Sequence, residues 1–356
     1  MAVAEARDAL QWKIAPHRIS DDAFLELPRR LRTLLARLVG ASPDEIILGN
    51  SASHGLNVLA NGLRWSRGDE VLVLANDFPA TVFSWFIAER RGARIRQLQL
   101  HPPQLTAERL SAELAPRTRV VCLSWVHSLT GHVLDLAALG HVCAQAGVLF
   151  VVNATQGLGN RPLNVGALPL AALTSSGFKW LCGPYATGFS WIRPDVLEQL
   201  EPIQSYWLAL PDDAGLDLND EGEHRPRTHL SARGYDVFGT ANFLNFMPWA
   251  AALEYLLEQG IDQIAAHDAA LVRRIVESLP RGINLISPGT EEERSAIVVM
   301  SHADRSRNPQ TLRALAEAGV DVALRGGNIR ISPHLYNTTD EIDGVLTVLA
   351  AAAAAP

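Results

Sequence analysis

The sequence predicts a doubly wound α/β fold, with a mostly parallel sheet in a large domain and a smaller α+β domain towards the C-terminus. Apolar runs of strand length alternate with segments of helical periodicity, the pattern of βαβ units whose right-handed crossovers build a parallel sheet. Polar residues directly follow several of these runs, and open α/β sheets bind ligands at the carboxyl ends of their strands. At 356 residues the chain is long enough for a large and a small lobe.

The composition narrows the class of protein. Hydrophobic residues make up 48% and charged residues 19%, which is typical of a folded globular chain. A net charge of -7 gives no reason to expect nucleic acid, and no basic run suggests a membrane surface. The three cysteines indicate no disulfide framework and fit a reducing compartment. Because residues 1–14 lack the apolar core of a signal peptide, we expect a cytoplasmic protein, and we predict no metal site.

We predict a large domain over residues 15–245 and a small domain over 246–356. Residues 1–14 would form an arm that packs on the small domain or on a partner. Residues 203–228 are polar and rich in Asp, Pro and Arg, which predicts a long loop. This loop contains Tyr206 and Trp207.

The first helix is predicted within residues 19–40, where apolar side chains recur at helical spacing up to Gly40. A short strand at 46–48 leads to a turn of small residues, 49–55, that opens the next helix. Free N–H groups and the positive end of the helix dipole make such a turn an anion site. The alternative is ordinary N-capping by Ser51 or Ser53.

The next strands are predicted at 71–74 and 120–126, separated by a helix that Thr106 caps. Phe78 follows the first of them, and an exposed aromatic ring at a strand end serves either packing or ring stacking. His127 and Ser128 begin a polar loop after the second strand.

The strand at 148–152 is almost uninterruptedly apolar and ends in the polar residues Asn153, Thr155 and Gln156. A second apolar patch, 171–174, leads into Ser176 and Lys179. Apolar residues flank this lysine, so we expect it to lose hydration, which disfavours its charged form and makes the amine a nucleophile. The alternative is a lysine whose stem lies on apolar residues while its ammonium stays in water.

The small domain is predicted to hold a helix from Asp262, a strand at 296–300 and a helix capped by Asn308. Arg330 ends a later strand, and its guanidinium fork matches a carboxylate. Arg325 is a second candidate for this contact, and a surface ion pair is the alternative. Thr338 with Glu341 forms a capping box before the last helix.

The segment SGFKWLCGPYATGF resembles the lysine motif of the class V aminotransferase family. These are pyridoxal-phosphate (PLP) enzymes of fold type I and include cysteine desulfurases, kynureninases and isopenicillin-N-epimerase-like proteins. The resemblance extends over most of the chain, from about residue 42 to the last helix. It implies that Lys179 forms the Schiff base with PLP and shuttles the proton in catalysis.

Further motifs assign the cofactor contacts by the same resemblance. Ala52 and Ser53 match the phosphate turn, Phe78 matches the residue that stacks on the pyridine, and His127 or Ser128 matches the contact to the 3′-oxygen.

Asn153 with Gln156, and Ser176 beside the lysine, lie in the remaining cofactor motifs. Thr240 matches a threonine that reaches the phosphate of the other subunit, which implies a homodimer. Arg330 matches the arginine that grips the substrate carboxylate, in the motif RISPHLYN.

The chain departs from the family at two of these positions. Asn153 stands where the family has an aspartate that keeps the pyridine nitrogen protonated, and Phe178 replaces a frequent histidine. An amide stabilises no pyridinium charge, so we expect racemisation or elimination to be tolerated better than a full transamination. Desulfurases need a mobile cysteine in the small lobe, whereas Cys182 is the last cysteine of this chain.

We therefore expect a PLP-dependent enzyme that acts at the α-carbon of an amino acid or amino-acid-like metabolite, with an epimerase-like reaction favoured. The alternatives are a lyase (C–S cleavage or β-elimination), an aminotransferase, and a PLP-fold protein that binds without turnover. The expected partner is a small amino-acid-type substrate.

Overall fold

The computed structural model describes residues 1–100, 105–205, 231–239 and 241–354. Thr240, Tyr206 and Trp207 therefore lie outside the described residues. The chain forms two compact units, here named the sheet unit and the C-terminal unit. The sheet unit comprises Met1–Ser124, Asp135–Thr155 and Leu163–Glu258, and the C-terminal unit comprises Trp125–Leu134, Gln156–Pro162 and Gln259–Pro356. The boundary after residue 245 stays a prediction.

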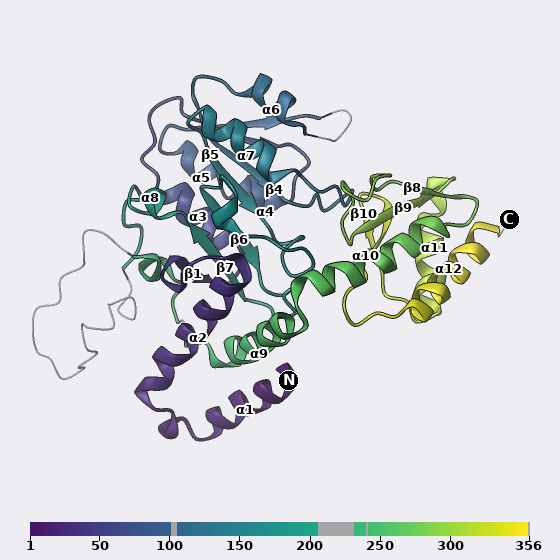
Figure 1. The fold of residues 1–356 in the computed structure, drawn as a ribbon, viewed down its shortest axis with the longest axis horizontal. Coiled ribbons are helices and arrows are strands. Elements are labelled where there is room, and N and C mark those ends of the chain that lie inside the picture. The colour runs from purple at the N-terminus through teal and green to yellow at the C-terminus, as the bar shows by residue number, and fades with distance from the viewer. Residues whose placement is uncertain (101–104, 206–230, 240, 355–356) are drawn as a thin grey trace, which may run out of the picture. The chain divides into compact units, whose positions relative to one another are not determined.

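The sheet unit is built on a 7-stranded sheet, part of which is labelled in Figure 1. The strand order is β1-β7-β6-β5-β4-β2-β3. Its strands are Ile46–Gly49 (β1), Glu70–Leu74 (β2), Arg94–Leu98 (β3), Thr118–Ser124 (β4), Leu149–Asn153 (β5), Ala172–Ser176 (β6) and Gly188–Ile192 (β7). Strands β2 to β6 are mutually parallel, and β7 is antiparallel to both of its neighbours, β1 and β6. The predicted doubly wound, mostly parallel sheet is thereby confirmed.

Helices cover this sheet on both faces, which explains why its strands are apolar at consecutive positions. Val71 and Val73 pack in one core cluster with Leu56 and Leu59 of α3 (Ala52–Gly62). Leu72 points to the opposite face, because side chains alternate along a strand, and it too is buried.

The remaining helices of the sheet unit are Ala2–Ile14 (α1), Asp21–Val39 (α2), Pro79–Phe83 (α4), Phe86–Glu89 (α5), Ala107–Glu113 (α6), Leu136–Gln145 (α7), Pro194–Leu197 (α8) and Phe243–Gln259 (α9), with α9 ending at the edge of the unit. Helix α2 stops at Gly40, whose φ of 71° is the left-handed conformation that glycine adopts without strain. The Thr106 side chain accepts a hydrogen bond from the backbone N–H of Arg109, as predicted for its cap. Helix α1 contacts α2 and α9 through Glu5–Arg30 and Trp12–Phe243.

The C-terminal unit has a 4-stranded antiparallel sheet in the order β10-β11-β9-β8, together with long helices. Its elements are Ile261–Glu277 (α10), Ile283–Leu285 (β8), Val298–His302 (β9), Asn308–Glu317 (α11), Ala323–Arg325 (β10), Asn328–Ile331 (β11) and Thr339–Ala354 (α12). The predicted capping box is present, because Thr338 and Glu341 bond to each other's backbone N–H groups.

The prediction that Asn308 caps α11 is wrong. Arg307 is the cap residue, and Asn308 is the first residue of the helix. Its buried side chain accepts a hydrogen bond from the N–H of His302 (2.7 Å) and donates to Ser301 Oγ (2.9 Å). The amide therefore joins the helix to β9, a contact between separate elements that a local sequence pattern does not encode.

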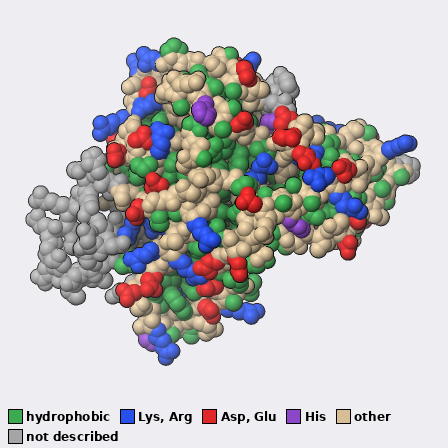
Figure 2. Space-filling view, in the orientation of Figure 1, with side chains coloured by type: hydrophobic (Ala, Val, Ile, Leu, Met, Phe, Trp, Pro, Cys, Tyr) green, Lys and Arg blue, Asp and Glu red, His purple; other side chains and the backbone are tan. Residues whose placement is uncertain are grey.

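Basic and acidic side chains are interspersed on the face drawn in Figure 2, and neither forms a large patch there. Within the described ranges, no helix is both long and apolar enough to cross a membrane. Nor do those residues include a cluster of His, Cys, Asp or Glu side chains suited to a metal ion.

Candidate active site

Asn153 ends β5 and lies at the centre of a hydrogen-bonded chain at the carboxyl edge of the sheet. Its Nδ2 donates to Thr81 Oγ1 (2.9 Å), and its Oδ1 accepts from the backbone N–H (3.1 Å) and the hydroxyl (2.7 Å) of Thr155. A backbone N–H can only donate, so the atom facing it must be the amide oxygen. The contacts therefore fix the orientation of the amide, with its N–H side turned away from Thr155.

The chain of hydrogen bonds continues from Thr81 to the ends of β4 and β2. The hydroxyls of Thr81 and Ser124 lie 3.0 Å apart. The N–H of Ser124 donates to Oδ2 of the buried Asp77 (2.8 Å), which follows β2. Thr81, Ser124 and Asp77 were not predicted as site residues, although polar residues after apolar strands were the available signal.

In the other direction from Asn153, the hydrogen bonds run through Thr155 to β6 and to the start of α3. Thr155 Oγ1 accepts from the N–H of Ser176 (3.1 Å), and Ser176 Oγ accepts from the N–H of Ala52 (3.1 Å). The predicted residues Asn153, Ser176 and Ala52 are thus joined through Thr155. Distant segments of the sequence meet here because parallel strands end at the same edge of the sheet.

The turn before α3 has the features of an anion site. Ser51 is the cap residue but its side chain makes no capping hydrogen bond, so the N-capping alternative is not realised by Ser51. Ser53 is half-buried in the first turn of the helix. A Cβ on Gly188 would lie 2.7 Å from the backbone of Ser51, so β7 passes close against the turn. The N–H groups and dipole of this 11-residue helix suit a phosphate.

Lys179 lies in the turn after β6, and its side chain is exposed. Its Nζ lies 5.4 Å from the centroid of the Phe178 ring, which stacks on Tyr185. We expected the apolar neighbours of Lys179 to shield it from water. In the single chain this expectation is wrong, because the lysine side chain is exposed. Trp180 and Leu181 are buried, but successive side chains in a turn point in different directions, so their burial does not cover Lys179.

The backbone around Lys179 is held in unusual conformations. Cys182 and Ala186 have φ values of 52° and 62°, in the left-handed region that non-glycine residues rarely adopt. Cβ atoms on Gly177 and Gly183 would lie 2.6 and 2.4 Å from the buried Trp249 ring. Such strain persists only where the surrounding packing imposes it, and it concentrates at functional sites.

Phe78 lies at the same edge of the sheet, before α4. Its ring is 46% exposed. Its N–H donates to Asp77 Oδ1 (2.6 Å), the carboxylate that also accepts from Ser124. The aspartate therefore sets the backbone position from which the Phe78 ring projects.

The C-terminal unit holds the other predicted site residues. Arg330 on β11 is half-buried, and its Nη1 donates to the backbone oxygen of Ser128 (3.3 Å). Its Nε has no hydrogen-bond partner and no described carboxylate lies within ion-pair distance, so the surface-ion-pair alternative is not realised among these residues. Burial, assisted by the charge of Arg325, lowers the pKa of Arg330. Arg325 itself is exposed.

His127 and Gln156 complete this set in the C-terminal unit. The Nδ1 of His127 lies 3.0 Å from Thr130 Oγ1, within the loop that also contains the buried Ser128. Gln156 is half-buried.

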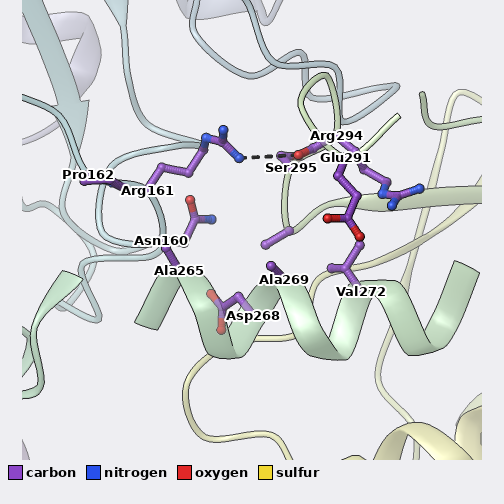
Figure 3. Close-up of a pocket in the computed structure, with 11 residues that line it drawn as sticks. Asn160, Arg161, Pro162, Ala265, Asp268, Ala269, Val272, Glu291, Arg294 and Ser295 are labelled. Atoms are coloured by element: carbon purple, nitrogen blue, oxygen red, sulfur yellow. Dashed lines mark hydrogen bonds between the residues drawn. The ribbon is translucent and has the colours of Figure 1, made fainter. Parts of the chain in front are cut away.

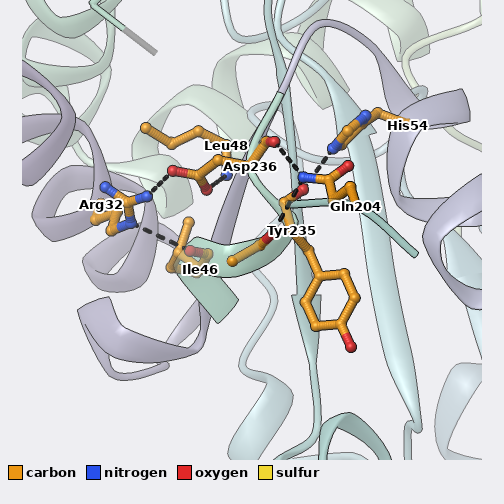
Figure 4. Close-up of polar contacts among 8 residues, drawn as sticks. Arg32, Ile46, Leu48, His54, Gln204, Tyr235 and Asp236 are labelled. Atoms are coloured by element: carbon orange, nitrogen blue, oxygen red, sulfur yellow. Dashed lines mark hydrogen bonds and ion pairs between the residues drawn. The ribbon is translucent and has the colours of Figure 1, made fainter. Parts of the chain in front are cut away.

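A buried ion pair that the sequence did not reveal supports the phosphate turn (Figure 4). Arg32 on α2 pairs with Asp236, 204 positions away, and Asp236 Oδ1 accepts from the N–H of Leu48 on β1 (2.8 Å). His54, in the first turn of α3, lies with its Nε2 2.7 Å from the backbone oxygen of Tyr235. These contacts attach the segment at 235–236 to β1 and to the start of α3.

A family model described as aminotransferase class-V matches residues 17–345. The chain belongs to the class-V aminotransferase family. It is a PLP-dependent enzyme of this family, and the predicted family, fold and cofactor are confirmed.

Among curated relatives, isopenicillin N epimerase of Streptomyces clavuligerus is 28% identical over 350 residues, which cover 92% of this chain and 86% of the relative. A probable cysteine desulfurase of Methanothermobacter thermautotrophicus is 25% identical over 336 residues, covering 87% and 80%. The family is therefore clear, whereas relatives with different reactions match at similar levels.

Solved structures share the fold. The cystine C-S lyase C-DES, in complex with its product cysteine persulfide, superposes with a TM-score of 0.87 at 22% identity and covers 98% of this chain and 93% of its own. The apo cysteine desulfurase of Thermococcus onnurineus NA1 has a TM-score of 0.84 at 20% identity, with 98% and 91% covered.

Proposed function

We propose that the enzyme acts at the α-carbon of an amino acid or amino-acid-like metabolite, with Lys179 as the residue that holds PLP covalently and moves the α-proton. The observation that carries this proposal is the position of Lys179. It lies in the turn after β6, the strand whose last residue, Ser176, is hydrogen-bonded into the chain that includes Asn153. Its side chain is exposed and so can be reached by a cofactor and a substrate.

The residues of the sheet unit fit the cofactor. At the start of α3 the backbone N–H of Ser53 would bind the phosphate, and Ala52, whose N–H donates to Ser176 Oγ, would lie beside it. The exposed ring of Phe78 would stack on the pyridine. By the same resemblance, His127 or Ser128 of the C-terminal unit would contact the ring hydroxyl. When bound, PLP supplies an electron sink for the pair left at the substrate α-carbon.

Asn153 would face the pyridine nitrogen as a donor. Its amide oxygen is occupied by Thr155, and its NH₂ group carries two N–H bonds, one of which goes to Thr81. A neutral donor favours a ring nitrogen that accepts a hydrogen bond and therefore carries no proton. This weakens the electron sink, which supports reactions that pass quickly through the carbanion.

Arg330 would bind the substrate carboxylate. A half-buried guanidinium without a described carboxylate partner is available for a bidentate contact. Such a contact would orient the α-carbon without taking part in proton transfer.

Among the reactions of the family, we favour epimerisation. Isopenicillin N epimerase is 28% identical, as is a probable cysteine desulfurase, so the preference rests on the chemistry. Epimerisation needs only a modest electron sink, with Lys179 on one face of the α-carbon and a second proton donor on the opposite face. A lyase reaction is the second candidate, because several relatives at similar identity are probable cysteine desulfurases. All three cysteines lie in the sheet unit, which argues against a persulfide-forming cysteine in the C-terminal unit.

We also propose a homodimer in which Thr240 reaches the phosphate of the partner's cofactor. The support is the match of Thr240, in the segment FGTAN, to the family's threonine. Sedimentation of the full chain would test the dimer, and a monomer with bound cofactor would contradict it.

The visible spectrum of the protein purified with PLP tests the assignment of Lys179. We expect a band that shifts when an amino acid is added, and its loss in Lys179→Ala, because only the lysine amine bonds to the cofactor. Lys13 provides a matched control, since it lies on α1 and Lys13→Ala should keep the band. An unchanged band in Lys179→Ala would refute the assignment.

The reaction is tested separately with a panel of amino acids in deuterated buffer. Epimerisation predicts deuterium at the α-carbon together with loss of optical rotation, whereas a lyase releases ammonia and the β-substituent. Transamination would instead consume an added keto acid, and that outcome would contradict the role proposed for Asn153.

A further inference from the structure

The C-terminal unit contains a cavity of about 180 Å³ with a mixed polar and apolar lining, and none of the predicted cofactor or substrate residues lines it (Figure 3). Asn160 and Arg161 form one side, and Asp268, Ala269 and Val272 of α10 form the floor. At roughly 30 Å³ for each water molecule, the cavity has room for about six waters or one small organic molecule.

Two side chains in this cavity are buried with polar atoms that bond to nothing in the described chain. Asn160 is 2% exposed, and both its amide nitrogen and its amide oxygen lack a partner. Asp268 is 1% exposed, and its Oδ1 also lacks a partner, while its Oδ2 is bonded to His334 Nδ1 (2.9 Å). Buried polar groups are almost always satisfied, so these atoms indicate an occupant.

The guanidinium of Arg161 lines the same cavity and has no counter-ion among the described residues. Arg161 donates from Nη1 to the backbone oxygen of Arg294 (3.3 Å), and no carboxylate of the described residues lies within ion-pair distance of it. Burial lowers the pKa of Arg161. Glu291 also lines the cavity, but its carboxylate is paired with Arg273 (2.6 Å).

The arrangement of these groups indicates which charges a ligand of this cavity would carry. In Figure 3 the Arg161 guanidinium, the Asn160 amide and the Asp268 carboxylate follow one another along one side of the cavity. Arg161 requires an anionic acceptor, and Asp268 Oδ1 requires a donor. A simple anion would leave Asp268 Oδ1 without a donor, and a simple cation would be repelled by Arg161 and by Arg294, which also lines the cavity.

We propose that this cavity binds a small zwitterion of the α-amino-acid class, with its carboxylate on Arg161 and its ammonium group on Asp268 Oδ1. Asn160 lies between them and bonds to both ends of the ligand. A short aliphatic side chain packs against Ala269 and Val272. The volume excludes large side chains, since drug-sized sites have roughly 300–1,000 Å³. The site does not rest on the proposed reaction, because it uses none of its residues.

Titration calorimetry of the full chain with bound PLP tests the site, with L-alanine as the probe and propionate and ethylamine as its single-charge fragments. To keep the substrate site out of the measurement, the background variant is Arg330→Met, and the visible band is recorded at each addition. We expect L-alanine to bind, and each fragment to bind at least about tenfold more weakly, because each lacks one charge-assisted hydrogen bond.

Arg161→Gln should weaken L-alanine binding by about tenfold or more and leave the visible band unchanged. Arg274→Gln is the matched control: Arg274 is exposed on α10, the helix that carries Asp268, and pairs with Asp343 outside the cavity lining, so this variant should retain binding. If Arg161→Gln fails to fold, Arg161→Lys is the second variant. It keeps the positive charge but lacks the bidentate geometry of the guanidinium, so it too should weaken L-alanine binding.

Equal binding of L-alanine in Arg161→Gln and in its parent would overturn the proposal, as would propionate binding as tightly as L-alanine. A crystal of the full chain soaked in L-alanine that shows only ordered water in the cavity would do the same. Loss of the visible band alone would count against the proposed reaction and leave this site standing, so the two failures are distinguishable.

Discussion

Asn153 carries no charge where the family places an aspartate, and its contacts fix the orientation of its amide. Thr155 occupies the amide oxygen with two hydrogen bonds, so the amide turns its N–H side towards Thr81 and the rest of the site. In the proposed function this orientation presents an N–H donor, and no negative charge, to the bound pyridine.

Asn153→Asp should restore a protonated pyridine nitrogen, because a carboxylate beside the ring stabilises the positive charge. The backbone N–H and hydroxyl of Thr155 would satisfy one oxygen of the new carboxylate. The nitrogen-15 chemical shift of labelled cofactor should report a neutral ring in the wild type and a pyridinium in the variant. A wild-type shift that already reports full protonation would refute the role of Asn153.

Arg330→Met should raise KM for an amino-acid substrate by an amount equivalent to about 1.5–3 kcal/mol, the usual contribution of a hydrogen bond to a charged group. The matched control is Arg325→Met, because Arg325 is exposed and lies on the neighbouring strand β10. We expect little change there. Steady-state kinetics would contradict the assignment if Arg325→Met had the larger effect.

At the scale of elements, the Arg32–Asp236 pair joins α2, β1 and the segment at 235–236 in the interior of the sheet unit. Burial raises the pKa of Asp236, and the Arg32 charge opposes that shift. The pair is stabilising only while both partners are present, because a lone buried charge is unfavourable.

Arg32→Met should lower the free energy of unfolding by about 3–5 kcal/mol, and Arg32→Met combined with Asp236→Leu by less. Without Arg32 the folded-state pKa of Asp236 rises further above its ordinary value of 3.8. The folded state then binds the proton more tightly, so stability should fall as pH rises from that value through the raised pKa. Urea unfolding between pH 4 and pH 8 tests this, and a flat profile in Arg32→Met would contradict it.

Gly177→Ala should lower the unfolding free energy by about 1–3 kcal/mol through overpacking. The new methyl group would lie 2.5 Å from Thr187 Oγ1 and 2.6 Å from the Trp249 ring. Gly344→Ala is the matched control within α12, where no atom lies within 4 Å of the new methyl group. A helical glycine in open space should instead gain about 0.5–1 kcal/mol on substitution. Equal effects would show that the turn at Lys179 is not packed as described.

At the scale of the whole molecule, burial separates the cysteines into two reactivity classes. Cys122 and Cys143 are buried in the sheet unit, whereas Cys182 is exposed. Burial raises the pKa of Cys143 to about 12 and that of Cys122 above its usual range. Since the thiolate is the reactive form, the buried thiols should be inert while the chain is folded.

Alkylation at pH 8 followed by peptide mass spectrometry should therefore label Cys182 in the folded protein and all three cysteines in urea. Cys182→Ser is the control and should abolish labelling of the folded chain. Labelling of Cys143 before Cys182 would contradict the burial pattern.

The sequence alone determined the alternation of strands and helices, the Gly40 and Thr106 helix boundaries, the lysine motif and the family. Each of these is a local pattern, since periodicity, capping and a motif depend on residues a few positions apart. The phosphate turn and Asn153 also stood out, because a polar residue after an apolar strand is visible in one dimension.

Only the tertiary structure decided which of these residues meet. The hydrogen bonds from Asp77 through Asn153 to Ala52, and the Arg32–Asp236 pair, join segments that the sequence keeps far apart. The exposure of Lys179 and the unpartnered groups of the C-terminal cavity depend likewise on packing in three dimensions. Burial and hydrogen bonding between distant segments follow from where strands end and helices cross, and a local pattern carries no record of that geometry.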